Sequence, residues 1–318
     1  MDRMKLAIVI PAYKETYFRK TLDCLARQTN RDFNVYVGDD ASPHPLGEIA
    51  KPFAETLNLR YTRFPNNIGA KNLVEQWRRC IALTQNEEWL WLFSDDDLAS
   101  PNCVEIFYDQ QRRRPGDVYR FNTRVIDGND QESSPTLRSP DYESSEQMAF
   151  HLLHWQRGNS MPDHIFSREI YERKGGFVYT PFAQGADWAT SILFSQDSGM
   201  NVLQEGMISW RRAGQNVSSL VSKNQRQTVL GHYAFIEWVL THFRYLRDYG
   251  PKNGISYKDI RDAAAHNLRE VIIKHYRGIP ARMYFAHLRF LRKYLEMPSL
   301  QAFRHLASIV YNSEFKPS

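Results

Sequence analysis

The sequence predicts an α/β fold with a mostly parallel central sheet, and three observations support this. Strand-like and helix-like segments alternate through the first third of the chain, with short connections between them. Residues 6–10 form an uninterrupted apolar run, typical of a strand that is buried on both faces of a parallel sheet. A second such run, 89–93, leads into three consecutive aspartates, Asp95, Asp96 and Asp97. Alternation of this kind implies right-handed crossovers in an open sheet.

The other elements of this half follow from their own patterns. The first strand ends at Pro11, and apolar residues then recur at helical spacing through roughly 15–28. Residues 33–37 alternate as a second strand that runs into Gly38-Asp39-Asp40. Next in chain order we expect a weak helix at 46–57, a third strand at 59–64, and a helix at 73–81 that leads to the run 89–93.

Composition sets the outer limits. With 318 residues, 42% hydrophobic and 24% charged, the chain has room for one large or two medium domains. The net charge of +5 fits an anionic substrate or a membrane surface, whereas nucleic acid is not expected because no recognition motif accompanies the charge. No apolar stretch approaches the roughly 20 residues of a membrane span, and the N-terminus lacks a secretory signal, so we expect a cytoplasmic protein. The unpaired spacing of Cys24, Cys80 and Cys103 predicts reduced core thiols.

The aspartate triplet is the most informative group in the chain. Ligands of parallel sheets bind outside the carboxyl ends of the strands. Three adjacent carboxylates at that place repel one another and are costly unless they share a cation. Hard ions such as Mg²⁺ or Mn²⁺ take oxygen ligands, and Mg²⁺ completes its shell with water and substrate phosphates. The alternative is a solvated acidic turn before the next helix; the rest of the chain favours a metal–diphosphate site.

Four motifs in order make residues 5–105 resemble a known family. The motifs are Ile8-Val9-Ile10-Pro11-Ala12-Tyr13, Gly38-Asp39-Asp40-Ala41-Ser42, Asn67-Ile68-Gly69, and Phe93-Ser94-Asp95-Asp96-Asp97 followed by Pro101. Together they resemble the inverting family 2 glycosyltransferases of bacterial polysaccharide and lipopolysaccharide synthesis, which have the GT-A (nucleotide-diphospho-sugar transferase) fold. Farther on, Gly185-Ala186-Asp187-Trp188 resembles the segment with the catalytic base. Ser209-Trp210-Arg211 with Gln215-Asn216-Val217-Ser218 resembles the loop that closes over the donor.

The resemblance implies roles for the matched residues. Asp40 would accept a hydrogen bond from the imide N–H of a uracil or thymine base, while Asp39 could instead cap the local backbone. Arg211 would reach the diphosphate, because the planar guanidinium suits phosphate oxygens. Lys71 would neutralise the diphosphate or lie near the base, unless it is simply a solvated helix lysine. The nucleoside pocket would be lined by Pro11, Ala12 and Tyr13.

The metal ligands and the base follow from the acidic motifs. The family's Asp-x-Asp pattern falls on Asp95 and Asp97, but Ser94 stands where many relatives have an aspartate, which leaves the register open. We expect Asp96 as the main ligand of Mn²⁺ or Mg²⁺, Asp97 as the second, and Asp95 on the ribose. Asp187 would take the proton of the acceptor hydroxyl as that oxygen attacks the anomeric carbon. Its alternative role is a helix N-cap.

Three regions are predicted along the chain. Residues 1–105 would be the nucleotide-sugar-binding half and 106–225 the acceptor half of a catalytic domain, and 226–318 a C-terminal helical module. In that module Tyr284, Leu288, Leu291 and Leu295 form an apolar stripe beside several cations. The stripe either packs on the catalytic domain or lies on an anionic membrane that carries the acceptor. His164, after Pro162, is expected to be structural rather than a ligand.

The function predicted from sequence is therefore inverting transfer of a sugar from a nucleotide-sugar, with UDP-sugars preferred, to an acceptor hydroxyl of a glycan or a lipid-linked acceptor. One alternative is a non-catalytic nucleotide-sugar-binding scaffold. A sugar nucleotidyltransferase is a weaker alternative, because such enzymes carry a glycine-rich basic loop where this chain has Pro11-Ala12-Tyr13-Lys14-Glu15. The dinucleotide-binding pattern G-x-G-x-x-G is absent after the first strand.

Overall fold

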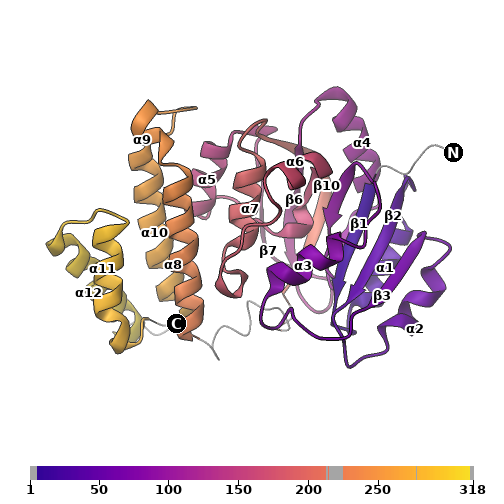
Figure 1. The fold of residues 1–318 in the computed structure, drawn as a ribbon, viewed down its shortest axis with the longest axis horizontal. Coiled ribbons are helices and arrows are strands. Elements are labelled where there is room, and N and C mark those ends of the chain that lie inside the picture. The colour runs from indigo at the N-terminus through magenta and orange to yellow at the C-terminus, as the bar shows by residue number, and fades with distance from the viewer. Residues whose placement is uncertain (1–5, 213, 215–224, 277, 316–318) are drawn as a thin grey trace. The chain divides into compact units, whose positions relative to one another are not determined.

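One sheet of ten strands organises the N-terminal part of the protein in the computed structural model (Figure 1). The structure describes residues 6–212, 214, 225–276 and 278–315; the expected donor-closing segment Gln215–Ser218 lies outside them. The strand order is β3-β2-β1-β4-β9-β6-β10-β5, with β7 beside β6 and β8 beside β10. The strands are β1 (Leu6–Ala12), β2 (Phe33–Asp39), β3 (Leu59–Arg63), β4 (Trp89–Leu92), β5 (Leu98–Ala99), β6 (Val118–Ile126), β7 (Glu132–Leu137), β8 (Tyr142–Glu143), β9 (His164–Ser167) and β10 (Met200–Arg211).

The main strands of this sheet share a direction. The pairs β3–β2, β2–β1 and β1–β4 are parallel, and so is β6–β10. Because β9 runs antiparallel to both β4 and β6, those two strands also point the same way. This confirms the predicted mostly parallel sheet, and it places the carboxyl ends of β1, β2 and β4 at one edge.

The helices of the first third begin and end close to the predicted positions. The pattern over 15–28 gives α1 (Phe18–Ala26), and the pattern over 73–81 gives α3 (Leu73–Ile81). The weak helix is shorter than predicted: α2 (Leu46–Ala50) passes at once into a 3₁₀ turn that contains Pro52, which has no N–H to continue an α-helix. The remaining helices are α4 (Cys103–Arg113), α5 (Ser145–Leu153), α6 (Arg168–Arg173), α7 (Ala186–Phe194), α8 (Gln225–His242), α9 (Tyr245–Tyr249), α10 (Tyr257–Tyr276), α11 (Tyr284–Lys293) and α12 (Ser299–Phe315), with 3₁₀ turns at Lys51–Phe53, Met161–Asp163, Pro181–Ala183 and Ala281–Met283.

The core lies on both faces of the β1–β2–β4 strands. Ile8, Val9 and Ile10, which alternate between the two faces of β1, are fully buried, as the uninterrupted apolar run predicted. Each such side chain contributes about 1.5–3 kcal/mol of burial free energy. The three cysteines are free thiols and are buried, which confirms their assignment to the core. The strand ends that carry the functional motifs therefore stand on a rigid base.

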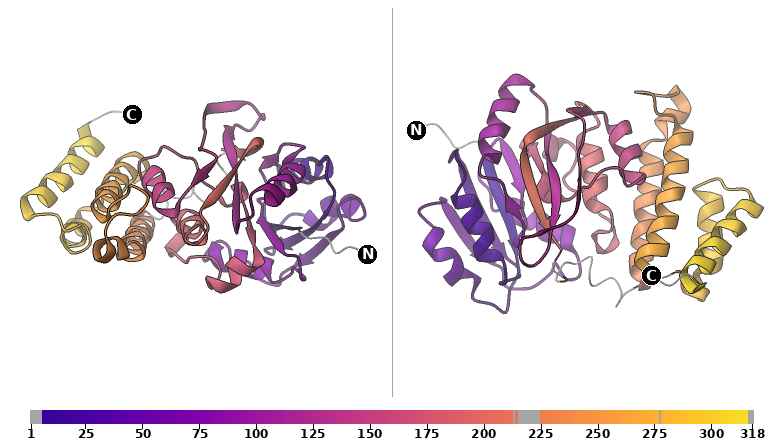
Figure 2. Two further views of the ribbon diagram at one scale, coloured as in Figure 1. Left: turned by 90° about the horizontal axis from the view of Figure 1, so that it is seen from above. Right: turned by 180° about the vertical axis from the view of Figure 1, so that it is seen from behind.

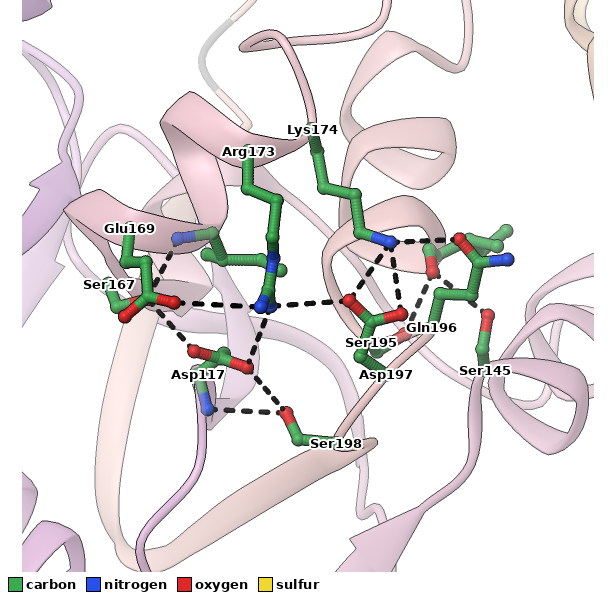
Figure 3. A network of polar contacts seen from close by, with 12 residues as sticks. Asp117, Ser145, Ser167, Glu169, Arg173, Lys174, Ser195, Gln196, Asp197 and Ser198 are labelled. Carbon is green, nitrogen blue, oxygen red and sulfur yellow. Dashed lines mark hydrogen bonds and ion pairs between the residues drawn. The ribbon is translucent and has the colours of Figure 1, made fainter.

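A polar network connects three segments that flank the sheet (Figure 3). Arg173, at the end of α6, lies 3.5 Å from Asp117 and 3.2 Å from Asp197. Lys174 lies 3.0 Å from the same Asp197, and the Ser198 hydroxyl donates to Asp117 at 3.2 Å. Exposed ion pairs contribute little individually. Several that share partners hold the start of β6, α6 and the α7–β10 turn together.

The chain forms two compact units. Unit 1 comprises Met1–Ser145, Arg157–Val178 and Thr190–Ala213, and unit 2 comprises Glu146–Gln156, Tyr179–Ala189 and Gly214–Ser318. The sequence placed the boundary at 225 and assigned all earlier residues to the catalytic domain. Two earlier segments join the C-terminal helices instead, because they pack against them. The Asn267 side chain of α10 donates to the Leu153 carbonyl at 3.3 Å. A Cβ at Gly231 of α8 would lie only 2.4 Å from the Pro181 carbonyl oxygen.

Within unit 2, α8 and α10 pack side by side, as do α11 and α12 (Figure 2). Val229 and Ile236 of α8 are buried, and so is Phe243 directly after the helix. In α11 and the turn that follows it, Leu291 and Leu295 are buried and Leu288 is half-buried, so the predicted stripe packs inward. Among the described residues, no helix is both long enough and apolar enough to cross a bilayer.

His164, which the sequence predicts to be structural, is buried. It lies on β9 beside Arg120 of β6, and its Nδ1 is 2.8 Å from the Ser160 carbonyl oxygen. Burial, together with the charge of Arg120, lowers the pKa of His164 to about 3. The ring is therefore neutral in the folded protein throughout the physiological range.

The buried neutral ring predicts a pH dependence of stability. As the pH falls below about 6.5, His164 takes up a proton in the unfolded chain and not in the folded one, so stability decreases toward pH 3. Between pH 7 and pH 5 this residue alone should lower the free energy of unfolding by about 2 kcal/mol. In urea unfolding, the free energy of unfolding of His164→Gln should therefore fall by about 2 kcal/mol less than that of the wild type between pH 7 and pH 5. The control is His44→Gln, at an exposed histidine. The same acid dependence in His164→Gln and wild type would contradict the prediction.

Candidate functional site

Three strand ends bring the predicted motifs to one edge of the sheet. Ala12, the last residue of β1, is in register with Asp39, the last of β2, and the Asp40 amide donates to the Ala12 carbonyl at 2.9 Å. The Phe93 amide donates to the Val9 carbonyl at 2.8 Å, which extends β4 alongside β1. Tyr13, the Asp39-Asp40 pair and the aspartate triplet therefore leave the sheet beside one another.

The first two aspartates of the triplet share one cation, the ammonium of Lys14. Asp95 Oδ2 accepts hydrogen bonds from the backbone amides of Tyr13 at 2.8 Å and Lys14 at 2.7 Å. The Lys14 Nζ lies 3.1 Å from Asp95 Oδ1 and makes a closer ion pair with Asp96. The side chain of Lys14 is 23% exposed, and those of Asp95 and Asp96 are 5% and 6% exposed. Largely withdrawn from water, the three groups depend on one another for charge balance.

Burial and mutual repulsion shift the pKa values of this cluster. Burial, and then the charge of Asp95, raise the pKa of Asp96 above its usual range. Burial, and then the charge of Asp96, raise the pKa of Asp97 to about 8. Burial opposes the charge of Lys14, but the carboxylates of Asp95 and Asp96 outweigh it and raise the lysine pKa. Burial and mutual repulsion therefore favour the uptake of a proton or of another cation by this cluster.

Asp97 turns away from the shared cation. Its Oδ1 accepts from the Arg211 amide at 2.7 Å, and its Oδ2 accepts from the Ser94 hydroxyl at 2.5 Å. Its backbone carbonyl accepts from the Thr21 hydroxyl at 3.0 Å. Ser94, which departs from the family pattern, thus holds the third carboxylate in place. Asp95 and Asp96, and not Asp97, face the shared ammonium, and the role of Asp97 as second metal ligand stays a prediction.

Arg211 lies in a different environment from the one predicted. Its side chain is fully buried, and its Nε donates to the Asp96 carbonyl at 2.8 Å. Its Nη1 donates to the Asp127 carbonyl at 2.9 Å and lies 2.5 Å from Asp130 Oδ1. The guanidinium carbon stands 4.1 Å from the ring centroid of Tyr17. Arg211 therefore fixes the backbone of the acidic loop, and the predicted contact with a diphosphate would require these interactions to break.

Asp40 anchors the Asn67-Ile68-Gly69 motif. Its Oδ1 accepts from the Ile68 amide and its Oδ2 from the Gly69 amide, both at 2.8 Å, and it pairs with Arg79. The guanidinium carbon of Arg79 lies 3.9 Å from the ring centroid of Phe64. A Cβ at position 69 would lie 2.6 Å from Asp40 Oδ2, so this approach requires glycine. The predicted hydrogen bond from a base to Asp40 stays a prediction.

The other pocket residues surround this edge. Asp39 Oδ1 accepts a hydrogen bond from the Ser42 amide at 2.7 Å, so Asp39 caps the local backbone, the alternative role that the sequence suggests for it. The Ser42 hydroxyl donates to the Tyr13 carbonyl at 2.7 Å. Tyr13 is 42% exposed, and Lys71 is exposed in the turn before α3. Pro11 and Ala12 form the end of β1. Their predicted roles in donor binding stay predictions.

Asp187 belongs to unit 2, in the first turn of α7. The helix begins at Ala186, so Gly185 and not Asp187 occupies the N-cap position. Gly185 has a φ of +69°, and a Cβ there would lie 2.6 Å from the ring of Phe235. Trp188 packs edge-to-face on Phe235, with 6.0 Å between the ring centroids. This segment is closely fitted to α8, Asp187 is half-buried, and its role as the base stays a prediction.

A divalent ion fits the two carboxylates that share a cation. Among the residues that the structure describes, no group of three or more His, Cys, Asp or Glu side chains is arranged as a metal centre. The oxygens of Asp95 and Asp96 nevertheless converge on one positive charge, that of Lys14. Mg²⁺ commonly uses only one or two carboxylates and completes its shell with water and phosphate. Asp95 and Asp96 are therefore the residues that would hold such an ion, and metal binding stays a prediction.

Sequence reasoning missed three residues of the site. Lys14, Ser94 and Arg79 each contact a predicted aspartate, yet none was predicted to belong to the site. A signal for Lys14 was present, because it follows the first strand as the triplet follows its neighbour β4. Opposite charges at the ends of adjacent parallel strands predict an ion pair. The helical position of Arg79 carries no such signal.

Comparisons with known proteins agree with this geometry. Residues 7–174 match the model of the family described as Glycosyl transferase family 2. The glycosyltransferase GlyA of Streptococcus pneumoniae is 26% identical over 127 residues, which make up 37% of this chain and 17% of that protein. The poly(ribitol-phosphate) β-N-acetylglucosaminyltransferase TarS of Staphylococcus aureus is 32% identical over 97 residues, 30% of this chain and 16% of TarS.

The fold is similar over almost the whole chain. A crystal structure of part of S. aureus TarS in complex with UDP-GlcNAc superimposes with a TM-score of 0.71 at 15% identity, covering 98% of this chain and 90% of that one. This likeness confirms the predicted GT-A fold with its C-terminal helices. Since the family model spans more than half of the 318 residues, the chain belongs to glycosyl transferase family 2.

Proposed function

We propose that the protein transfers a sugar, with inversion, from a UDP-sugar to an acceptor hydroxyl in bacterial cell-surface glycan synthesis. The convergence of Tyr13, Asp40 and the aspartate triplet at the carboxyl edge of β1, β2 and β4 carries the proposal. Such an edge is where open α/β sheets bind nucleotides. The family match supports glycosyl transfer, and the relative TarS is named for the transfer of N-acetylglucosamine to poly(ribitol phosphate). The cytoplasmic location expected from the sequence is part of the proposal.

The proposed reaction is a single displacement at the anomeric carbon, accompanied by the transfer of one proton. The acceptor oxygen forms a bond to the anomeric carbon as the bond from that carbon to the diphosphate oxygen breaks, and UDP leaves with the electron pair. Asp187 receives the acceptor proton as general base. The transition state carries oxocarbenium character, and the leaving diphosphate gains negative charge.

Metal dependence is part of the proposal. A bound Mg²⁺ or Mn²⁺ supplies charge neutralisation at the departing diphosphate. Asp96 would be its main protein ligand, and Asp95 lies nearest to share it, because both carboxylates face the same cation. The Asp95 backbone contacts with Tyr13 and Lys14 hold that carboxylate in position.

Removal of the base separates transfer from donor binding. Asp187→Asn should reduce transfer by at least a thousandfold, since no group is left to accept the proton, while UDP affinity stays within about threefold of wild type. Release of UDP from UDP-GlcNAc, UDP-glucose and UDP-galactose, with polyol-phosphate and glycoside acceptors, measures the first quantity, and calorimetry the second. The matched control is Asp262→Asn, at an exposed aspartate paired with Lys258.

Two outcomes would count against this assignment. Near-normal turnover by Asp187→Asn would exclude that residue as the base. UDP binding by the wild-type protein without turnover of any donor would support the non-catalytic scaffold.

The Asp40–Gly69 contact predicts a sensitive point in the nucleoside pocket. Gly69→Ala places a methyl group 2.6 Å from Asp40 Oδ2, so the turn or the carboxylate has to move. We expect a loss of about 1–3 kcal/mol in stability and at least tenfold weaker UDP binding. Thermal unfolding and UDP calorimetry measure the two effects. Gly158→Ala is the control, because a Cβ at 158 meets nothing within 4 Å. UDP affinity equal to that of Gly158→Ala would argue against a pocket at this turn.

We further propose that the α11–α12 surface contacts an anionic membrane. The surface is defined by four exposed apolar side chains, Phe285, Leu300, Phe303 and Tyr311, and five exposed cations, Arg282, Arg289, Arg292, Lys293 and Arg304. These apolar residues differ from the predicted stripe, which packs inward. Exposed cations and exposed aromatic groups on the same part of the chain suit anionic headgroups, at about 1 kcal/mol for each Lys or Arg near the surface.

Vesicle binding tests this surface. Wild-type protein should co-sediment with vesicles in which about one lipid in three is phosphatidylglycerol, and not with vesicles of pure phosphatidylcholine. Phe303→Glu should weaken this binding about tenfold or more, because it places a charge among the apolar groups. Tyr249→Glu, at an 88% exposed residue of α9 outside the surface, is the control. Equal vesicle binding by Phe303→Glu and the control would contradict the membrane contact. So would a wild-type protein that binds no vesicles and forms a dimer that Phe303→Glu dissociates.

A further inference from the structure

We propose that Lys14 is an internal counter-cation that occupies the metal position between Asp95 and Asp96, so that a divalent ion enters by displacing it. The inference rests on the proposed function, because it concerns the donor site of that reaction. It goes beyond that function by making a lysine of this chain control when the metal binds.

The geometry identifies the position as one that a single cation fills. Lys14 Nζ lies 3.1 Å from Asp95 Oδ1 and closer still to Asp96, so both carboxylates point at the same nitrogen. A metal ion bound by the same oxygens would have to stand about 2.0–2.2 Å from them. The ammonium and the ion cannot occupy this volume together. Their positive charges would also repel each other strongly in a site where the side chains are largely buried.

The two ends of Lys14 differ in how firmly they are held. Its backbone amide donates to Asp95 Oδ2 at 2.7 Å, at the end of β1, which fixes the main chain. Its side chain is a flexible four-carbon stem that is 23% exposed, so the ammonium has a route away from the carboxylates. When a diphosphate binds at this edge, its oxygens offer the released ammonium a new partner. Diphosphate and metal should therefore bind cooperatively, each removing the obstacle to the other.

The alternative is that Lys14 serves permanently in place of a metal ion. The charges argue for exchange instead. Asp95, Asp96 and Asp97 lie in sequence within one loop, and a single ammonium faces two of them. A divalent ion supplies twice the positive charge at the same place. The diphosphate brings further negative charge. Without a metal ion, the single positive charge of Lys14 would have to balance both the carboxylates and the diphosphate.

Mn²⁺ binding to the full-length protein tests the proposal directly. The free Mn²⁺ signal in electron paramagnetic resonance gives the dissociation constant with and without UDP, independently of any sugar transfer. Lys14→Met removes the ammonium and keeps an unbranched, flexible side chain that is one atom shorter. It should bind Mn²⁺ at least tenfold more tightly than wild type in the absence of UDP. UDP should strengthen Mn²⁺ binding at least tenfold in wild type and about threefold or less in Lys14→Met.

The control reproduces the change in charge without the change in the site. Lys258→Met removes the same charge from an exposed lysine of α10 that pairs with Asp262 at 2.7 Å. Its Mn²⁺ affinity should stay within about twofold of wild type. Circular dichroism confirms folding, and Lys14→Gln replaces Lys14→Met if the methionine variant unfolds. Asp96→Asn in the Lys14→Met background should abolish the gained affinity, which assigns the ion to this site.

The outcomes separate this inference from the proposed function. Mn²⁺ affinity of Lys14→Met equal to or weaker than that of Lys258→Met would overturn the exchange, even if UDP binds and transfer proceeds. A gain of Mn²⁺ affinity in Lys14→Met, together with no UDP binding by any variant, would support the exchange and refute the donor site. A third outcome is that sugar transfer needs Lys14 while the protein neither binds nor requires a divalent ion. Lys14 would then replace the metal ion permanently, and the exchange would be overturned.

Discussion

The crowding of three carboxylates at the end of β4 is the constraint on which the rest of the site depends. Carboxylates in adjacent residues repel one another, and burial strengthens the repulsion because water no longer screens it. The protein resolves this by giving each aspartate a different set of partners. Asp95 accepts two backbone amides, Asp96 faces the Lys14 ammonium, and Asp97 turns inward to a hydroxyl and an amide.

The partners come from elements that are distant in sequence, so the whole of unit 1 participates. Thr21 of α1 and Arg211 of β10 hold the backbone of the loop, and Lys14 comes from the end of β1. Arg211 is itself enclosed by Tyr17 and Asp130. Backbone groups that are fixed by buried hydrogen bonds lose little further entropy when a ligand arrives. The acidic loop is thus preorganised, and the Lys14 side chain is the part of the cluster that is partly exposed.

The same principle shapes the nucleoside side of the edge. Asp40 uses both oxygens on the amides of the Ile68-Gly69 turn and a third interaction on Arg79. Its family position suggested contact with a base, and the structure shows what it does for the fold. A carboxylate oxygen has more than one lone pair, so the two roles are compatible in principle. Glycine at 69 is required by the close approach of Asp40 and not by an unusual φ.

Much of the fold was predictable because it follows from local patterns. The apolar run at β1 and the helical spacing of α3 are properties of contiguous residues, and both elements lie where they were expected. The division into units was not predictable, because α5 and the turn at Pro181 join α8 and α10 through packing that no local pattern records. In the site, the identity of the residues was easier to predict than the orientation of their side chains. The sequence named the aspartates and Arg211, but whether Asp97 faces a cation or Ser94 depends on side-chain geometry three residues away.

The most direct test is the position of the ion in crystals grown with UDP and Mn²⁺, located by anomalous scattering at the manganese edge. The account predicts one peak within about 2.0–2.3 Å of an Asp96 oxygen, on the side shared with Asp95, with the Lys14 ammonium moved away from both. A peak on Asp97, or UDP bound with the Lys14 ammonium still between Asp95 and Asp96 and no manganese there, would contradict it.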